Sequence, residues 1–478
     1  MKKVTCTPRS SPAEGARCSL GAESRKGLRI VFIAMSGLRA CDPELTALGL
    51  TLPGFIERNR SIASLPSLGL LTLAGMTPAC HARRYLEMPD LDDLERLPRD
   101  VDLVAISSFS AQIKEAYKVA AHYRALGIPV VIGGLHVTVL PQEALAHGAT
   151  VVVGEGEAVW LEVLRDAEQG QLRPLYDASG AEFSLAAAPM PAYELLDPER
   201  YNRITVQTSR GCPWRCNFCA SSILLTRKYK QKPALQVLAE IDRICALWPR
   251  PFIEFADDNT FCHRDYWKAL LPEIAKRPIK WFTESDLSIH EDEALLTLMR
   301  EAGCAEVLIG FESPTADGLD GVETKRNWKF SRAPQYREAI RRIQAHGIRV
   351  NACFVVGLDG HTTRVFDEVL DFVAEALPFD VQVTVPTPFP GTPLYAQLQR
   401  EGRLLHDRAW ERCTLFDVNF QPTHMSPQEL SVGSRRLVVA LYSEEATLRR
   451  REHFKQLRQQ THALERTQGL APGRRAQR

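Results

Sequence analysis

Long apolar runs are missing from this chain of 478 residues. No stretch approaches the roughly 20 consecutive apolar residues that a membrane-spanning helix needs. The chain opens with Met1, Lys2 and Lys3, but a polar run with proline and serine follows where a secretory signal would carry its apolar segment. We therefore expect residues 1–27 to be a disordered leader and the protein to be cytoplasmic.

A surplus of charge of either sign is also absent. The 59 Lys+Arg residues face 58 Asp+Glu residues, which gives a formal net charge of +1. This balance lacks the basic footprint of a nucleic-acid-binding protein, so we expect no nucleic acid as a partner. Hydrophobic residues make up 45% and charged residues 24%, as in soluble globular proteins, and the length favours two packed domains.

Cysteine is too sparse for a disulfide scaffold, at 12 residues in the whole chain. Most of these cysteines are scattered, and we expect them to be reduced and packed as small apolar residues. The scattered positions are Cys6, Cys18, Cys41, Cys80, Cys245, Cys262, Cys304, Cys353 and Cys413. Cys212, Cys216 and Cys219 instead fall within eight residues, and this crowding needs a chemical reason.

Short apolar runs alternate with helical stretches over residues 28–175, which predicts an α/β domain with a doubly wound, Rossmann-like parallel sheet. The expected strands lie in 28–35, 101–109, 129–134 and 149–157. Small or polar residues end several of them, namely Ser107, Ser108, Gly133, Gly134, Gly154 and Glu155. Sheets of this kind bind ligands beyond the carboxyl ends of their strands, so these residues are candidates for a cofactor site.

A second β/α series follows residues 176–200, which carry several prolines and are predicted to be a linker. Its six expected strands lie in 203–209, 252–258, 279–285, 306–313, 348–357 and 379–388. Helical stretches are expected at 234–247, 291–302, 334–346 and 363–376. We therefore predict a partial (β/α)6 barrel of the TIM type over residues 201–404, with its chemistry at the carboxyl ends of the strands.

The remaining residues are less regular. Residues 405–447 are expected to form a small mixed accessory region, with a helical stretch after Pro427. Residues 448–478 are rich in Arg and Gln and are predicted to be a polar, basic tail with a disordered end.

Cys212, Cys216 and Cys219 follow the first predicted barrel strand, on a loop with the spacing C-x3-C-x2-C. Three thiolates on one loop can hold three irons of a [4Fe–4S] cubane and leave the fourth iron open for a small molecule. A structural zinc site needs four ligands, commonly from two C-x2-C pairs, and no second pair exists here. His263 or Cys245 is the candidate for a fourth ligand beside the three loop cysteines. A thioredoxin-like redox pair leaves Cys212 unexplained.

The loop closely resembles the signature of the radical S-adenosylmethionine (SAM) superfamily, in which SAM binds the open iron and is cleaved by one electron. The resemblance implies that Phe218 lies against adenine and that SAM is also contacted at the ends of the later strands. Those positions are Asp257, Asp258, Asn259, Ser285, Glu312, Ser313 and Gly357. For each, a polar residue that merely caps a strand is the alternative. Glu254 and Glu284 alternate within their strands and are expected to face solvent.

The N-terminal segment is similar to the cobalamin-binding domain that precedes many radical SAM barrels. The similarity rests on Gly133-Gly134-x-His136, on Gly154-Glu155-Gly156-Glu157 and on the segment 65–71. Corrinoid folds often present a histidine to cobalt from the loop after the first strand, but residues 35–46 contain no histidine. His136 is the nearest candidate for an axial ligand, although a structural hydrogen bond beside the glycines is the favoured interpretation.

The resemblance implies a cobalamin-dependent radical SAM methyltransferase that acts on an unactivated carbon of a small-molecule substrate. It implies three cofactors, a [4Fe–4S] cluster, SAM and cobalamin, and an external electron donor such as flavodoxin or ferredoxin. A relative that closes a ring or oxidises its substrate is the nearest alternative. A methylthiotransferase is disfavoured because that family carries three further cluster cysteines in its N-terminal domain, whereas residues 28–175 hold only Cys41 and Cys80. A corrinoid carrier would leave the three clustered cysteines without a role.

Overall fold

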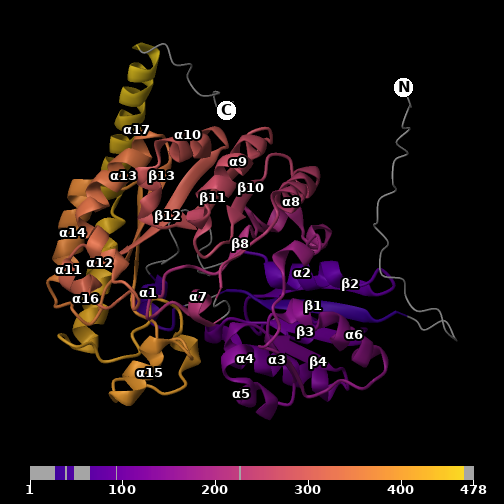
Figure 1. Cartoon of the computed structure of the whole chain (residues 1–478). Coiled ribbons are helices and arrows are strands. Elements are labelled where there is room, and N and C mark those ends of the chain that lie inside the picture. Colours follow the sequence, from indigo (N-terminus) through magenta and orange to yellow (C-terminus); the bar gives the residue numbers. More distant parts are fainter. Residues whose placement is uncertain (1–26, 38–39, 48–64, 93, 225–227, 468–478) are drawn as a thin grey trace, which may run out of the picture.

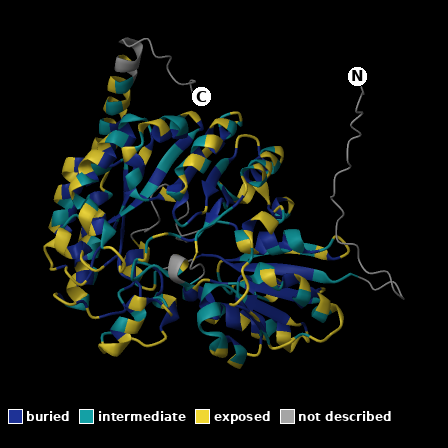
Figure 2. Cartoon of the chain, viewed as in Figure 1, coloured by how far each residue is buried: buried dark blue, intermediate teal, exposed yellow. Residues whose placement is uncertain are grey.

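The computed structural model describes residues 27–37, 40–47, 65–92, 94–224 and 228–467. The predicted leader up to residue 26 and the end of the predicted tail lie outside the described residues. The described chain folds into two lobes, each built on a six-stranded sheet (Figure 1). Both sheets are largely buried between helices (Figure 2).

The N-terminal lobe contains a parallel sheet in the order β2-β1-β3-β4-β5-β6. Its strands are β1 (Arg29–Met35), β2 (Ala82–Met88), β3 (Leu103–Ser107), β4 (Val130–Gly133), β5 (Thr150–Gly154) and β6 (Leu175–Ala178). The covering helices are α2 (Leu68–Met76), α3 (Ile113–Ala125), α4 (Leu135–Val139), α5 (Pro141–Ala146) and α6 (Trp160–Glu168). Helices α2 and α6 pack on one face and α3 on the other, which confirms the predicted doubly wound sheet.

The second lobe contains a parallel sheet in the order β14-β13-β12-β11-β10-β7. Its strands are β7 (Ile204–Val206), β10 (Phe252–Phe255), β11 (Lys280–Ser285), β12 (Cys304–Glu312), β13 (Arg349–Val355) and β14 (Asp380–Thr384). Strands β7 and β14 form the two edges, so this is a partial barrel of six β/α units, as predicted. The helices between the strands include α8 (Ala234–Leu247), α9 (Arg264–Ile274), α10 (Glu293–Glu301), α13 (Tyr336–Ala345) and α14 (Val365–Ala376).

Several predicted boundaries need correction. Strand β2 was not expected because its sequence carries two arginines and a glutamate, which an edge strand tolerates. The predicted linker contains β6, whose pairing with β5 extends the first sheet to Ala178. The predicted tail begins inside α17 (Glu444–Thr467), a mostly polar helix anchored by buried Arg450 and Phe454.

The accessory region returns to the N-terminal lobe. It follows α15 (Pro393–Arg400) and contains the short helix η10 (Trp410–Arg412) and the predicted helix after Pro427, which is α16 (Pro427–Leu441). Trp410 is 3% exposed and belongs to the core on the α3 side of the first sheet. Its Nε1 donates to Glu143 Oε2 at 3.0 Å, and its ring lies edge-on to His136.

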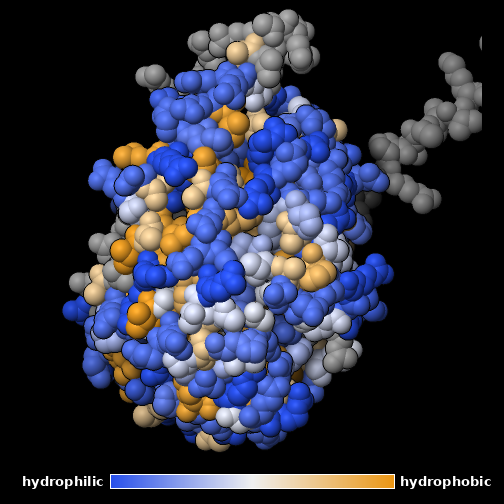
Figure 3. Space-filling model, turned by 90° about the vertical axis from the view of Figure 1, so that its left-hand side faces the viewer, coloured by the Kyte–Doolittle hydropathy of each residue, from blue (hydrophilic) through white to orange (hydrophobic). Residues whose placement is uncertain are grey.

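The exterior agrees with the composition. The face that carries α14 and α16 is mostly hydrophilic, with apolar residues in scattered patches (Figure 3). Among the described helices, none is both long and apolar enough to span a bilayer.

Removal of the Trp410 side chain should loosen the accessory region. Trp410→Ala deletes a buried indole and one hydrogen bond to Glu143, so we expect a loss of roughly 3–5 kcal/mol in unfolding free energy. Trp410→Phe keeps most of the packing and should cost only about 1 kcal/mol. Urea unfolding curves measure both values, and an unchanged midpoint for Trp410→Ala would show that this contact does not hold the accessory region.

Candidate active site

The loop with the three cysteines begins where β7 ends and is held by the carboxylates that follow β10. Asp257 Oδ1 accepts from the backbone N–H groups of Thr208 at 2.7 Å and Ser209 at 2.9 Å. Asp258 Oδ2 accepts from the N–H of Gly211 at 2.7 Å. Gly211 has a φ of 96°, a conformation that favours glycine, so the chain can turn sharply just before Cys212.

Cys212, Cys216 and Cys219 are all half-buried, and none of the ten described cysteines forms a disulfide. Burial and, to a smaller extent, the charge of Cys219 raise the pKa of Cys212 to about 11. Burial likewise raises the pKa of Cys216 to about 12, with the charges of Cys219 and Cys212 acting in the same direction. The three sulfurs therefore lie within electrostatic reach of one another, and bound iron would stabilise their thiolate forms.

The described residues contain no group of three His, Cys, Asp or Glu side chains arranged for a single metal ion. A cubane cluster is wider than one ion, so three sulfurs spread along one loop fit a cluster better than they fit zinc. Their assignment as cluster ligands stays a prediction that this donor set supports.

The outer edge of the cysteine loop is fixed by the segment 322–328. Cys216 forms an isolated antiparallel bridge with Glu323, and the N–H of Thr324 donates to the Arg215 carbonyl at 2.9 Å. The Glu323 carboxylate accepts from four backbone N–H groups, those of Arg215, Lys325, Arg326 and Trp328. The loop is thus tied down on both sides before any cofactor binds.

Asn259, Trp214 and Asp286 form a group of polar contacts beside Cys212, and this group was not predicted from the sequence. Asn259 Nδ2 lies 3.9 Å from Cys212 Sγ and donates to Asp286 Oδ2 at 2.9 Å. Trp214 Nε1 donates to the same oxygen at 3.0 Å. Burial acts to raise the pKa of Asp286, but hydrogen bonds from Ser288, Trp214 and Asn259 outweigh it and lower the pKa. Ser285 is buried next to this carboxylate, and its hydroxyl donates to the Asp286 carbonyl.

The other predicted SAM positions meet at the ends of β12 and β13. Phe218 packs against Val355 and Leu358, which brings it beside Gly357. Ser313 Oγ lies 2.9 Å from Nε2 of His361, whose Nδ1 accepts from the Gly357 N–H. Burial lowers the pKa of His361 to about 4, so its ring is neutral.

Glu312 has a φ of 64° and is paired with buried Lys329, whose Nζ lies 2.6 Å from Glu312 Oε1. Lys329 also donates to the Gly310 carbonyl at 2.7 Å. The sequence analysis predicted no role for Lys329 or His361. Contact of Glu312, Ser313 or Gly357 with SAM stays a prediction.

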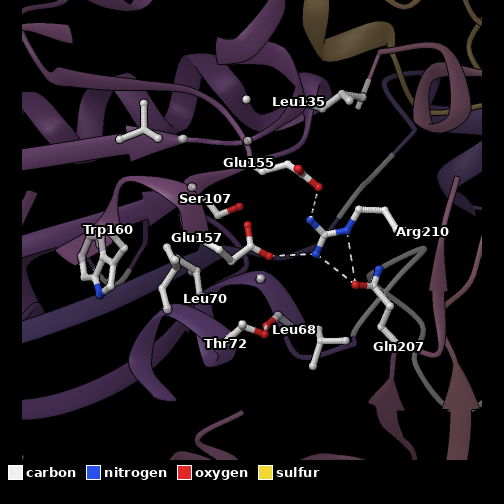
Figure 4. Close-up of a pocket in the computed structure, with 18 of the residues that line it drawn as sticks. Leu68, Leu70, Thr72, Ser107, Leu135, Glu155, Glu157, Trp160, Gln207 and Arg210 are labelled. Carbon is white, nitrogen blue, oxygen red and sulfur yellow. Dashed lines mark hydrogen bonds and ion pairs between the residues drawn. The ribbon is translucent and has the colours of Figure 1, made fainter. Parts of the chain in front are cut away.

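A cavity of about 300 Å³ lies where the two lobes meet, at the carboxyl ends of β3, β4 and β5 (Figure 4). Five of the cofactor residues predicted in the N-terminal lobe line it, namely Ser107, Gly133, Gly134, Gly154 and Glu155. The second lobe contributes Gln207, Arg210, Ser221, Ala256 and Asp258 to the same cavity. A Cβ added at Gly133 would make an ordinary van der Waals contact with Val152 at 3.7 Å.

Two of the cofactor residues predicted in the N-terminal lobe lie outside the lining of this cavity. Ser108 is buried and donates to the Phe109 carbonyl. His136 is fully buried, with Nδ1 3.1 Å from Ser110 Oγ and Nε2 3.1 Å from Glu143 Oε1. Because both ring nitrogens are engaged, the geometry supports the structural role of His136 rather than cobalt ligation.

Arg210 links the cavity to the cysteine loop. Its guanidinium lies 2.7 Å from Glu155 Oε1 and 2.8 Å from Glu157 Oε1, and it also contacts Gln207 (Figure 4). Lys230 Nζ reaches the second oxygen of Glu155 at 2.6 Å. Burial acts to raise the pKa of Glu155, but hydrogen bonds from Lys230 and Arg210 outweigh it and lower the pKa. The two lobes are therefore joined by the buried ion pairs of Arg210, which lies two residues before Cys212.

The expectation that Glu254 and Glu284 face solvent is wrong for Glu254, which is buried 2.9 Å from Arg203 Nε. Trp281 packs outward on Trp267 of α9, so by alternation Glu284 on the same strand points into the barrel. Glu284 keeps contact with solvent there, but burial among protein groups and the charges of Glu254 and Asp258 raise its pKa to about 7. Strand alternation alone could not tell the barrel interior from the exterior.

Three segments of the chain match known protein families. Residues 63–164 match the B12 binding domain, residues 206–373 match the radical SAM superfamily, and residues 392–476 match a domain of unknown function (DUF4070). The first match contains the walls of the cavity that come from the N-terminal lobe, and the second contains the cysteine loop.

Individual curated proteins are similar to more than half of the chain. The chain is 27% identical to the bacteriochlorophyllide d C-12(1)-methyltransferase of Chlorobaculum tepidum, over 77% of this chain and 82% of that protein. It is 27% identical to the anaerobic magnesium-protoporphyrin IX monomethyl ester cyclase of Rubrivivax gelatinosus, over 57% of this chain and 53% of that protein.

Among solved structures, the fold resembles that of the radical S-adenosylmethionine methyltransferase TsrM from Kitasatospora setae, solved with cobalamin and a [4Fe–4S] cluster. The TM-score is 0.63 at 16% identity, with 87% of this chain and 90% of that chain covered.

Loss of Arg210 should weaken cobalamin binding without removing the cluster. Arg210→Gln removes the ion pair between Arg210 and Glu157 and costs the lobe junction roughly 3 kcal/mol, because breaking a buried ion pair leaves a carboxylate uncompensated. After anaerobic reconstitution we expect less cobalamin per chain and an unchanged iron content. Arg173→Gln, which removes an exposed ion pair of the N-terminal lobe, is the control. Equal cobalamin in the two variants would contradict this role.

Glu284 should make the unfolding free energy depend on pH. Its folded pKa of about 7 lies above the ordinary 4.5, so the folded state holds this proton more tightly than the unfolded state. The wild type should therefore lose stability as pH rises from about 5 to 8, and Glu284→Gln should lose less. Thermal midpoints of the apoprotein at both pH values measure the difference, and parallel curves for the two proteins would refute it.

Proposed function

Because this chain belongs to the cobalamin-dependent radical SAM enzymes, we propose that it transfers a methyl group from SAM to an unactivated carbon of a small-molecule substrate. One observation carries the proposal. The cavity of the B12-binding lobe is closed on its other side by Gln207, Arg210 and Asp258, which come from the strand ends that hold the cysteine loop. The two cofactor sites therefore share a wall, as a reaction that uses both requires.

The proposed roles of the chain follow from its contacts. Cobalamin, when bound, supplies a methyl carrier, and the cluster supplies the electron that cleaves SAM. Asp257, Asp258 and Glu323 hold the loop so that the three sulfurs keep a fixed arrangement. The buried ion pairs of Arg210 fix the distance between the lobes, and this supports positioning of both cofactors on one substrate.

We further propose that the electron comes from an external one-electron donor such as flavodoxin or ferredoxin, and that the enzyme works in the cytoplasm. The match to the radical SAM superfamily supports both, because a [4Fe–4S] cluster needs reduced thiolate ligands and must itself receive an electron.

A ring-forming or oxidative reaction without methyl transfer is the second candidate. The similarity to a cyclase over 57% of this chain supports it. Product mass separates the candidates, since only the first adds one methyl group.

The cysteine loop offers the decisive test of the reaction class. Reconstituted wild type with dithionite should cleave SAM to 5′-deoxyadenosine, whereas Cys216→Ala should lose both cluster absorbance and cleavage, because an incomplete ligand set cannot hold the cubane. Cys245→Ala, a half-buried cysteine on α8, is the matched control and should retain both. Methyl-labelled SAM and metabolites of a deletion strain then test transfer, and label that never leaves SAM in any extract would refute it.

A further inference from the structure

Exposed basic side chains lie directly outside the cysteine loop. Arg215 sits between Cys212 and Cys216, and Lys325 and Arg326 follow the residue that pairs with Cys216. The side chains of all three basic residues are exposed. The acids within 320–327 do not offset them fully, because Asp320 and Glu323 bring two negative charges against three positive ones and Glu323 is buried. We refer to Arg215, Lys325 and Arg326 as the basic patch.

The backbone under the basic patch is held rigidly against the loop. Asn217 N–H donates to the Val322 carbonyl at 2.9 Å, and the Thr324 N–H donates to the Arg215 carbonyl. Burial acts to raise the pKa of Glu323, but hydrogen bonds from four backbone N–H groups outweigh it and lower the pKa. Glu323 therefore stays ionised and keeps the segment folded around it. The backbone of this segment therefore lies against the cysteine loop, whereas the three basic side chains of the patch are exposed to solvent.

The other sides of the loop are directed inward. One side rests on Asp257 and Asp258 of the barrel, and another is joined through Arg210 to the B12-binding lobe. The side that carries the basic patch reaches solvent. A protein that gives an electron to the cluster must come close to it, so this side is the natural approach.

Resting on the proposed function, we propose that the basic patch is the docking surface for an acidic one-electron donor protein. Contacts of redox partners are small and transient, and complementary charge contributes mainly to the rate of encounter. Arginine and lysine side chains around the approach to the cluster would steer a donor whose acidic residues surround its flavin or iron–sulfur group. In the step itself the donor loses one electron, and SAM gains it through the cluster as its C5′–S bond breaks.

The test compares two reductants on reconstituted holoenzyme. Lys325→Glu/Arg326→Glu should cleave SAM at the wild-type rate with dithionite, because a small reductant needs no docking surface. With a bacterial flavodoxin, its reductase and NADPH, kcat/KM for flavodoxin should fall by about tenfold or more at low salt. Wild-type and variant rates should converge in high salt, where the steering charges are screened.

A matched variant controls for the change in net charge. Lys276 and Lys280 are exposed at the opposite end of the barrel, since β11 starts at Lys280 and runs roughly 17 Å to Ser285 near the loop. Lys276→Glu/Lys280→Glu should keep the flavodoxin-dependent rate. An equal loss in both double variants, a loss with dithionite as well, or an unchanged flavodoxin rate would overturn the docking surface. Absence of SAM cleavage by wild type with dithionite would refute the proposed function itself.

Discussion

The start of the cysteine loop is held between carboxylates from two directions, and the rest of the site depends on this arrangement. From the barrel, Asp257 and Asp258 accept the backbone N–H groups of the residues before Cys212. From the other lobe, Glu155 and Glu157 bind Arg210. The loop therefore cannot shift without breaking buried, charge-assisted hydrogen bonds, and the wall between the cavity and the cysteine loop keeps its shape.

The buried carboxylates fix the geometry of the cysteine loop at a cost in the free energy of folding. Buried carboxylates are costly to desolvate, and burial raises the pKa of Asp257 to about 6 although backbone and side-chain hydrogen bonds from Thr208 and Ser209 act against it. Apolar side chains at the same positions would bury surface without specifying direction. Carboxylates instead fix where each N–H of the loop points, which is what a cluster site with one open iron requires.

Much of this molecule could be predicted from its sequence because the signals are local. Apolar runs marked the strands around Ile33 and Ile309, and the spacing of Cys212, Cys216 and Cys219 marked the loop. Long-range pairs were invisible. Arg210 and Glu155 are 55 residues apart, and they meet only because the lobes pack together. His136 stands beside glycines that line the cavity, yet its ring turns into the core, and no local pattern distinguishes these directions.

The central claim is that cobalamin and the cluster occupy adjoining sites, and magnetic resonance on the holoenzyme tests it most directly. Arg210 lines the cavity and lies two residues from Cys212, a chain span of roughly 7 Å at most. The reduced cluster and cob(II)alamin, each with an unpaired electron, should therefore show dipolar coupling in one EPR spectrum. Two independent, uncoupled signals from protein loaded with both cofactors would contradict the account.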